Sequence, residues 1–169
     1  MAFAQIEVSS LRVNKLADPM GISPDEKPVL SWITTSTTKN STQTAYEVVV
    51  SSAGRRVWSS GKVASDNSTL VEYDGPNLPD TYYQWSVRVW DNHGKVSKRA
   101  TGSWQTALKN DEWKAEWIGE TMKRRPVNFR REATFAKPIK KATAYITSYG
   151  QYEAFINGVR VGDSYMTPG

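Results

Sequence analysis

The sequence contains no cysteine and a single histidine, and these two shortages exclude much of the chemistry that side chains perform. Without cysteine there can be no disulfide scaffold, no thiolate metal site and no cysteine nucleophile. A zinc site combines several cysteine or histidine ligands, so His93 has no partner with which to build one. His93 lies in Asp91–Gly94, whose residue types favour a turn, and we expect no metal or catalytic role for it.

Long apolar runs are also missing, and positive charge is not concentrated in any segment. No apolar stretch approaches the roughly 20 residues of a membrane-spanning helix, and no glycine-rich phosphate loop is present. The 169 residues carry a formal net charge of +5, but the densest cationic group is only Lys123-Arg124-Arg125. A group of three is typical of a solvated loop. We therefore predict no membrane span, no nucleic-acid partner, no metal site and no cofactor.

The first residues leave the cellular location open between two interpretations. Ala2-Phe3-Ala4 followed by Gln5 fits the small-x-small cleavage box of a signal peptide whose apolar region is missing. The alternative is an ordinary start followed by chance alanines. The export interpretation predicts a periplasmic, cell-surface or secreted bacterial protein.

The sequence is instead rich in strand-like alternation of aromatic and β-branched residues. Turn residues separate these segments, and no segment keeps a helical period. The expected strands are 46–52, 55–63, 69–75 and two more on either side of Asp91–Gly94, the first of which is 82–90. Short strands at this spacing predict an all-β protein with an antiparallel sandwich.

The clearest of these strands runs from Tyr82 to Trp90. One face of it is predicted to be the core face, because it collects the large apolar side chains of Tyr83, Trp85, Val87 and Val89. Burying each of these is worth roughly 1.5–3 kcal/mol. Trp32, from an earlier strand, is expected to add another core aromatic.

The residues before that strand predict a tyrosine corner. Pro79-Asp80 turns the chain, Leu78 is expected to close the bottom of the core, and the Tyr83 hydroxyl is placed to bond back to the backbone. Together with Trp32, this spacing resembles a fibronectin type III-like domain. The resemblance implies an immunoglobulin-like β-sandwich, and it says nothing about function.

The end of the chain predicts a β-hairpin. Ile156 and Val159 flank Asn157-Gly158, the strongest short signal for a type I′ turn, and Ala154 then faces Val161. We expect four short strands here, at about 128–135, 142–148, 152–156 and 159–161. Four such strands bury little apolar surface, so this part predicts an incomplete second β-sandwich.

Several segments taken in order resemble the N-terminal region of bacterial α-L-rhamnosidases. They include "YEVVVSS", "YYQWSVRVWD", "WKAEWIG", "FRREATF" and "SYGQYEAFINGVRVGDSYMTPG". One departure is Ser59, where that family often has Asp. The resemblance implies a fibronectin type III-like sandwich at 5–108, a linker at 109–120, and the first strands of a truncated jelly-roll domain at 121–169.

The same resemblance implies a function for the parent protein. The parent would be a glycosidase that hydrolyses terminal α-L-rhamnosides with an acid/base carboxyl pair in a catalytic barrel outside these residues. No catalytic residue is expected here, and the chain alone is predicted to be inactive. Asp111, Glu112 and Glu116 cluster at the junction, where acids are more often solvated than catalytic. The expected partners are the parent's barrel and, through it, a rhamnose-containing glycan.

Sugar binding is the remaining possibility for the residues themselves, because aromatic faces stack on the C–H faces of sugars. Alternation points Trp90, Tyr82 and Trp58 outward, and these are the candidate carbohydrate-binding residues. The competing interpretation is that they pack against a neighbouring domain of the parent. Two alternative functions also stay open, a stand-alone carbohydrate-binding or adhesion module and an oligomer whose open sheet edges pair.

Overall fold

The computed structural model describes residues 6–120 and 126–162, which form two units, Met1–Trp117 and Ile118–Gly169. The Ala2-Phe3-Ala4 segment and the Lys123-Arg124-Arg125 cluster lie outside the described residues. Each unit is considered separately below.

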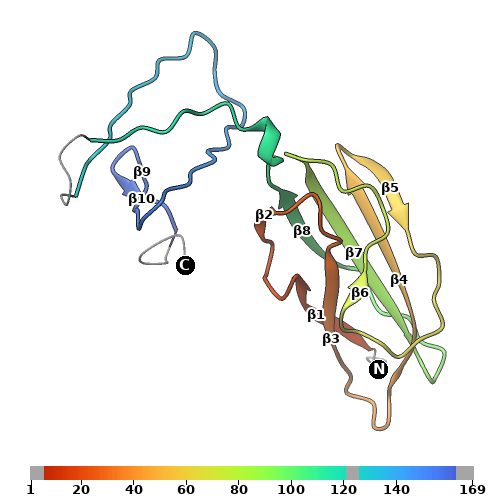
Figure 1. Ribbon diagram of the computed structural model, residues 1–169. Helices are drawn as coiled ribbons and strands as arrows, with labels where there is room; N and C mark the ends of the chain where they lie inside the picture. The colour runs from red at the N-terminus through yellow and green to blue at the C-terminus, as the bar shows by residue number, and fades with distance from the viewer. Residues whose placement is uncertain (1–5, 121–125, 163–169) are drawn as a thin grey trace. The chain divides into compact units, whose positions relative to one another are not determined.

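The first unit is a sandwich of two β-sheets, as the alternation predicts (Figure 1). The larger sheet has the order β2-β8-β7-β4-β5, with β2 Met20–Ile22, β8 Ala100–Thr106, β7 Tyr82–Asp91, β4 Gln43–Ser52 and β5 Arg55–Ser59. The smaller sheet has the order β1-β3-β6, with β1 Glu7–Val13, β3 Val29–Thr35 and β6 Val71–Glu72. The prediction of an all-β, immunoglobulin-like sandwich is confirmed.

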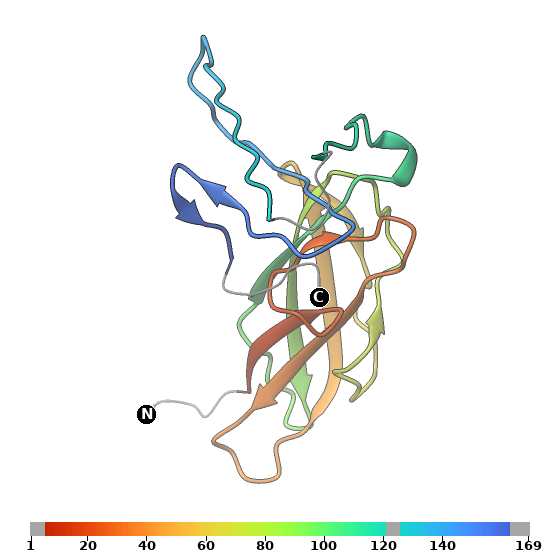
Figure 2. The same ribbon diagram turned by 60° about the vertical axis from the view of Figure 1, so that its left-hand side comes forward.

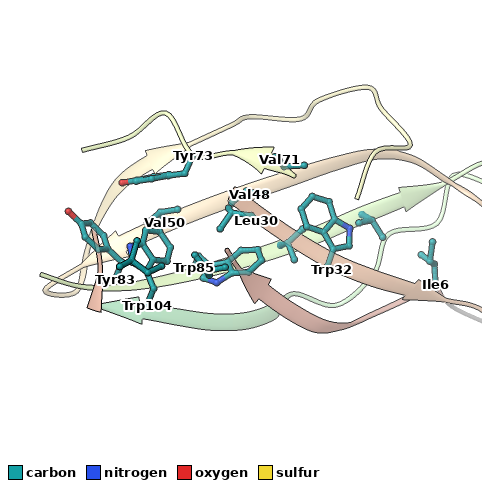
Figure 3. Close-up of a cluster of buried hydrophobic side chains, with 14 residues drawn as sticks. Ile6, Leu30, Trp32, Val48, Val50, Val71, Tyr73, Tyr83, Trp85 and Trp104 are labelled. Atoms are coloured by element: carbon teal, nitrogen blue, oxygen red, sulfur yellow. The ribbon is translucent and has the colours of Figure 1, made fainter. Parts of the chain in front are cut away.

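The core lies between the two sheets and is dominated by aromatic rings (Figure 3). The predicted inward face of β7 is confirmed, since Tyr83, Trp85, Val87 and Val89 are all at most 2% exposed. Trp32 is also buried, and its indole Nε1 donates a hydrogen bond of 3.0 Å to Gln43 Oε1. Burying this polar group is therefore not penalised by an unmade hydrogen bond.

The tyrosine corner is present, but its neighbour Leu78 does not fill the core. The Tyr83 hydroxyl accepts a 2.8 Å hydrogen bond from the Leu78 amide, as predicted. The Leu78 side chain is exposed, so the expectation that it closes the bottom of the core is wrong. That end of the core is already filled by three packed rings, with Tyr83 stacked on Trp104 at 4.9 Å and Tyr73 edge-on to Trp104 at 5.2 Å.

Two strands of the first unit carry no clear sequence signal. β1 contains a register shift between Ser9 and Arg12, which breaks its alternation. β2 has only three residues and pairs in parallel with β8, eighty residues further along the chain. Such pairings depend on distant partners, so local patterns do not reveal them.

The second unit contains the predicted hairpin and little other regular structure (Figure 2). β9 Phe155–Ile156 pairs with β10 Val159–Arg160, Ile156 lies opposite Val159, and the Val161 amide donates to the Ala154 carbonyl. The strands predicted at 128–135 and 142–148 are not formed. A stable strand needs a paired strand beside it and a layer beneath it, and within the described residues these two segments form no strand ladder.

Candidate functional site

The outer face of the five-stranded sheet carries side chains in straight rows across β4, β7 and β8. Residues directly opposite one another on hydrogen-bonded strands project to the same side of the sheet. The register therefore defines outward rows, among which are Tyr82–Gln105, Ser51–Gln84–Ser103, Val49–Ser86–Thr101 and Glu47–Arg88.

The two middle rows consist of short side chains except for Gln84, and they line a groove of about 450 Å³, which we call the outer-face groove. Tyr82 lines it from the row at one end and is 44% exposed. At the other end of the groove, the next row along the strands contains the longer side chains of Glu47 and Arg88. The groove thus arises from a change in side-chain length along the strands, on a floor of hydrogen-bonded backbone.

Asp18 lines the groove from the edge of the sheet, and the parallel pairing of β2 with β8 brings it there. The Gln105 amide donates a 3.0 Å hydrogen bond to the Pro19 carbonyl, which anchors the segment before β2. Asp18 Oδ1 then accepts hydrogen bonds from the Ser103 amide at 2.7 Å and the Ser103 hydroxyl at 3.0 Å. These contacts hold the carboxylate in one place.

Other polar groups of the groove have no partner in the protein. Among residues 6–120 and 126–162, neither the side-chain amide of Gln84 nor the hydroxyl of Thr101 makes a hydrogen bond. Ser51 and Ser86 are engaged, because the Ser51 hydroxyl donates to the Gln84 carbonyl and Arg99 donates to the Ser86 hydroxyl. The groove therefore offers unmade hydrogen bonds along its central strands.

The row beyond the groove is an ion-pair cluster. Glu47 Oε2 accepts a hydrogen bond of 2.6 Å from Arg88 Nε and another from Arg99 Nη2. Partial burial works against the charged form of Glu47, but the hydrogen bonds and positive charges of the two arginines outweigh it and lower its pKa. Glu47 therefore stays ionised and joins β4, β7 and the start of β8.

The three predicted carbohydrate-binding aromatics do not come together. Tyr82 and Trp90 lie at opposite ends of β7, about 27 Å apart at 3.4 Å per residue. Trp90 is half-buried, with Lys62 Nζ at 4.5 Å and Arg88 Cζ at 4.9 Å from its ring centroid. These cations cover its ring, and only Tyr82 borders the outer-face groove.

The outward direction predicted for Trp58 is wrong. Trp58 lies opposite Val50, whose side chain is in the core, and its ring is edge-on to buried Tyr73 at 5.3 Å. Val50 pairs with Trp58 and Ser51 with Arg56, so Val57 is an extra residue in β5, and this bulge changes which residues of β5 face inward. Simple alternation could not anticipate this bulge.

Asp18, Thr101 and Ser103 border the groove but were not singled out in the sequence. Thr101 and Ser103 are two residues apart on β8, so they project to the same face. The bounds of this strand were not predicted from the sequence, and correct bounds would have placed both residues on its outer face. Asp18 has no comparable signal, because its position depends on the β2–β8 pairing.

Three acidic side chains away from the groove, those of Glu112, Glu72 and Asp74, have structural partners. Glu112 ends the 3-10 helix Asn110–Glu112, and its carboxylate accepts a 2.8 Å hydrogen bond from the Lys109 amide. Glu72 and Asp74 both pair with Lys27. In the described part of the chain, no three His, Asp or Glu side chains gather into a metal-binding group, and no helix is long and apolar enough to cross a membrane.

Comparison with known proteins identifies related sequences and structures. Residues 8–110 match the family model of the Rha78A-like N-terminal immunoglobulin domain, and residues 137–169 match that of the α-L-rhamnosidase N-terminal domain. An α-L-rhamnosidase of Streptomyces avermitilis is 42% identical over 67% of this chain, and one of Formosa agariphila is 29% identical over 96%.

A solved structure agrees with the first unit. The crystal structure of the Streptomyces avermitilis α-L-rhamnosidase in complex with L-rhamnose matches with a TM-score of 0.63 and 41% identity over 68% of this chain. This chain spans 12% of that structure, and 12% and 21% of the two curated relatives. The fold, the tyrosine corner and both matches lead to one conclusion: the chain belongs to the Rha78A-like N-terminal immunoglobulin domain family and corresponds to the N-terminal region of α-L-rhamnosidases.

Proposed function

We propose that this chain is the non-catalytic N-terminal β region of an α-L-rhamnosidase. The observation that carries the proposal is the pair of successive matches to N-terminal domains, combined with coverage of only 12–21% of the relatives. The parent protein would hydrolyse terminal α-L-rhamnosides, with its acid and base carboxyls in a catalytic barrel elsewhere in its sequence. The partners of this region are then that barrel and, through it, a rhamnose-containing glycan.

The carboxyl groups of the first unit support a non-catalytic role. Glycoside hydrolysis needs two carboxyl groups facing one bond, about 5–5.5 Å apart for retention or about 6.5–9.5 Å for inversion. The outer-face groove is lined by one carboxylate, Asp18, and its Oδ1 is engaged by Ser103. One carboxyl group cannot supply both members of such a pair.

We also propose that the parent protein is exported. Ala2-Phe3-Ala4 followed by Gln5 supports this, because it has the form of a signal-peptide cleavage box. Fractionation of the source cells with an antibody to the first unit would test it. Exclusive recovery from the cytoplasm would contradict export.

An activity assay tests the proposed function. We expect the 169-residue chain to show no turnover of an aryl α-L-rhamnoside, and the complete parent protein to release the aryl group. Turnover by the chain alone would mean that catalytic groups lie within it. Absence of turnover by a folded parent would contradict the proposed activity of the parent.

A further inference from the structure

We propose that the outer-face groove binds a saccharide, with Tyr82 as the stacking surface and Asp18, Gln84 and Thr101 as hydrogen-bonding groups. This inference goes beyond the proposed function, which requires no ligand on this domain. It rests on the shape of the groove, on the chemistry of its lining and on the hydrogen bonds that its side chains leave unmade.

The groove has the dimensions of a ligand site and a rigid floor. Its volume of about 450 Å³ lies within the 300–1,000 Å³ typical of small-molecule sites. Neighbouring strands are about 4.8 Å apart, so side chains on β4, β7 and β8 span about 10 Å. Because all three strands are hydrogen-bonded to one another, the lining groups keep fixed relative positions.

The lining favours a polyhydroxylated ligand over a charged or apolar one. Its side-chain polar groups are mainly neutral hydroxyls and an amide, from Ser51, Ser86, Thr101, Ser103 and Gln84. These groups both donate and accept, which matches sugar hydroxyls. Asp18 would repel an anion, and among the described residues no lysine or arginine belongs to the lining, although Arg99 reaches Ser86 from outside it.

Tyr82 supplies the apolar contact that a sugar ring requires. Its side chain lines the groove and remains 44% exposed, so part of it is open to a ligand. It lies in the row next to Gln84, about 6.7 Å along the strand at 3.3–3.4 Å per residue. A sugar ring placed against Tyr82 would therefore have its hydroxyls within reach of the Gln84 amide.

Hydrogen bonds make the site specific. The Gln84 amide and the Thr101 hydroxyl are on adjacent strands in neighbouring rows, and neither has a protein partner among the described residues. Asp18 is held by Ser103 through Oδ1, which orients its carboxylate before a ligand arrives. An oriented acceptor loses little conformational freedom on binding.

Isothermal titration calorimetry provides the test, because the heat of binding is measured without a reporter side chain in the groove. The 169-residue chain is titrated with L-rhamnose, with a rhamnogalacturonan oligosaccharide and with a cello-oligosaccharide; the choice of rhamnose probes rests on the proposed function. We expect a saturable heat of binding with at least one of them. Absence of saturable binding with all three would overturn the inference.

Variants then locate the binding. Tyr82→Ala, Gln84→Ala and Thr101→Ala are each expected to weaken binding about tenfold, the effect of losing one good contact. Tyr149→Ala and Gln151→Ala remove the same residue types from exposed positions of the second unit and should leave binding unchanged. Melting curves confirm that each variant is folded.

The outcomes separate this inference from the proposed function. Binding that all three groove variants leave intact would place the site elsewhere and overturn the inference. Saturable binding of the cello-oligosaccharide alone, lost in the groove variants, would support a saccharide site that does not depend on rhamnose. The turnover assay of the parent protein does not depend on either result.

Discussion

At the scale of single residues, Gly102 is a position without room for a side chain. It lies opposite Trp85, and a Cβ at this position would come within 2.8 Å of the Trp85 indole Nε1. Trp85 is 2% exposed and belongs to the buried core cluster. We expect Gly102→Ala to lower the free energy of unfolding by about 1–3 kcal/mol, as overpacking does.

Urea unfolding followed by tryptophan fluorescence measures this effect. Gly119→Ala is the matched control, because a Cβ there meets nothing within 4 Å and its backbone is not left-handed. Equal unfolding energies for the two variants would show that Trp85 shifts at no cost, contrary to the expectation.

Asp91 makes the first unit sensitive to acid. Its carboxylate accepts hydrogen bonds from the Lys95 amide at 2.7 Å, the His93 amide at 2.9 Å and the Ser41 hydroxyl at 3.2 Å. Burial of Asp91 works against its charged form, but these hydrogen bonds outweigh that effect and lower the pKa. Because the folded-state pKa is depressed, the stabilisation is present above the ordinary pKa of about 3.9 and is lost as the pH falls through the folded-state value.

Asp91→Asn tests this pH dependence. The variant keeps one acceptor oxygen but loses the charge, so it should be less stable than the original chain at pH 7. The difference in unfolding free energy should shrink as the pH falls below about 4. Urea unfolding from pH 7 to pH 3 measures both chains, and parallel stability profiles would refute the assignment to Asp91.

At the scale of elements, the β9–β10 hairpin depends on its two-residue turn. Asn157 has φ 51° and Gly158 has φ 79°, the left-handed pair that a type I′ turn requires. An alanine at position 158 would have to adopt this conformation at a cost of about 1–2 kcal/mol. A two-stranded hairpin is only marginally stable, so a cost of this size in Gly158→Ala should raise the fraction of molecules in which the hairpin is open.

Amide hydrogen exchange at Val161 reports on this opening, since its amide donates a 2.8 Å hydrogen bond to the Ala154 carbonyl across the hairpin. We expect about tenfold faster exchange in Gly158→Ala. Gly150→Ala, where no positive φ is required and no atom lies within 4 Å, should exchange at the original rate. Unchanged exchange in Gly158→Ala would contradict the importance of the turn.

At the scale of the whole molecule, the first unit has a core of its own. Among the described residues, every member of that core cluster lies between Ile6 and Trp104, within the first unit. We expect a chain of residues 1–117 to melt within about 2 °C of the corresponding transition in the full chain. Differential scanning calorimetry makes the comparison, and a drop of 5 °C or more would show that the second unit stabilises the first.

The second unit leaves large apolar side chains exposed, including those of Phe129, Phe135, Phe155, Ile156 and Val159. Both strands of its hairpin are edges within the described residues, and an open edge can pair with another chain. Self-association between copies therefore stays a prediction. Light scattering over a range of concentrations tests it, and a mass that stays at that of the monomer would count against pairing.

Local sequence was sufficient for features whose causes are local. The inward face of β7 follows from period-two alternation, the tyrosine corner from the spacing of Leu78 and Tyr83, and the hairpin turn from Asn157-Gly158. In each case neighbouring residues supply both the pattern and its physical cause. Alternation also placed Tyr82 and Gln84 on the outer face.

Long-range pairing accounts for what the sequence did not reveal. Asp18 reaches Ser103, 85 residues away, only because β2 pairs in parallel with β8. Trp58 turns inward because Val57 is an extra residue in the pairing of β5 with β4. Leu78 stays exposed because Trp104 of the distant strand β8 packs with Tyr73 and Tyr83 at that end of the core. A groove between strands exists only once register and packing are set, since both are properties of segments in contact and not of any one segment.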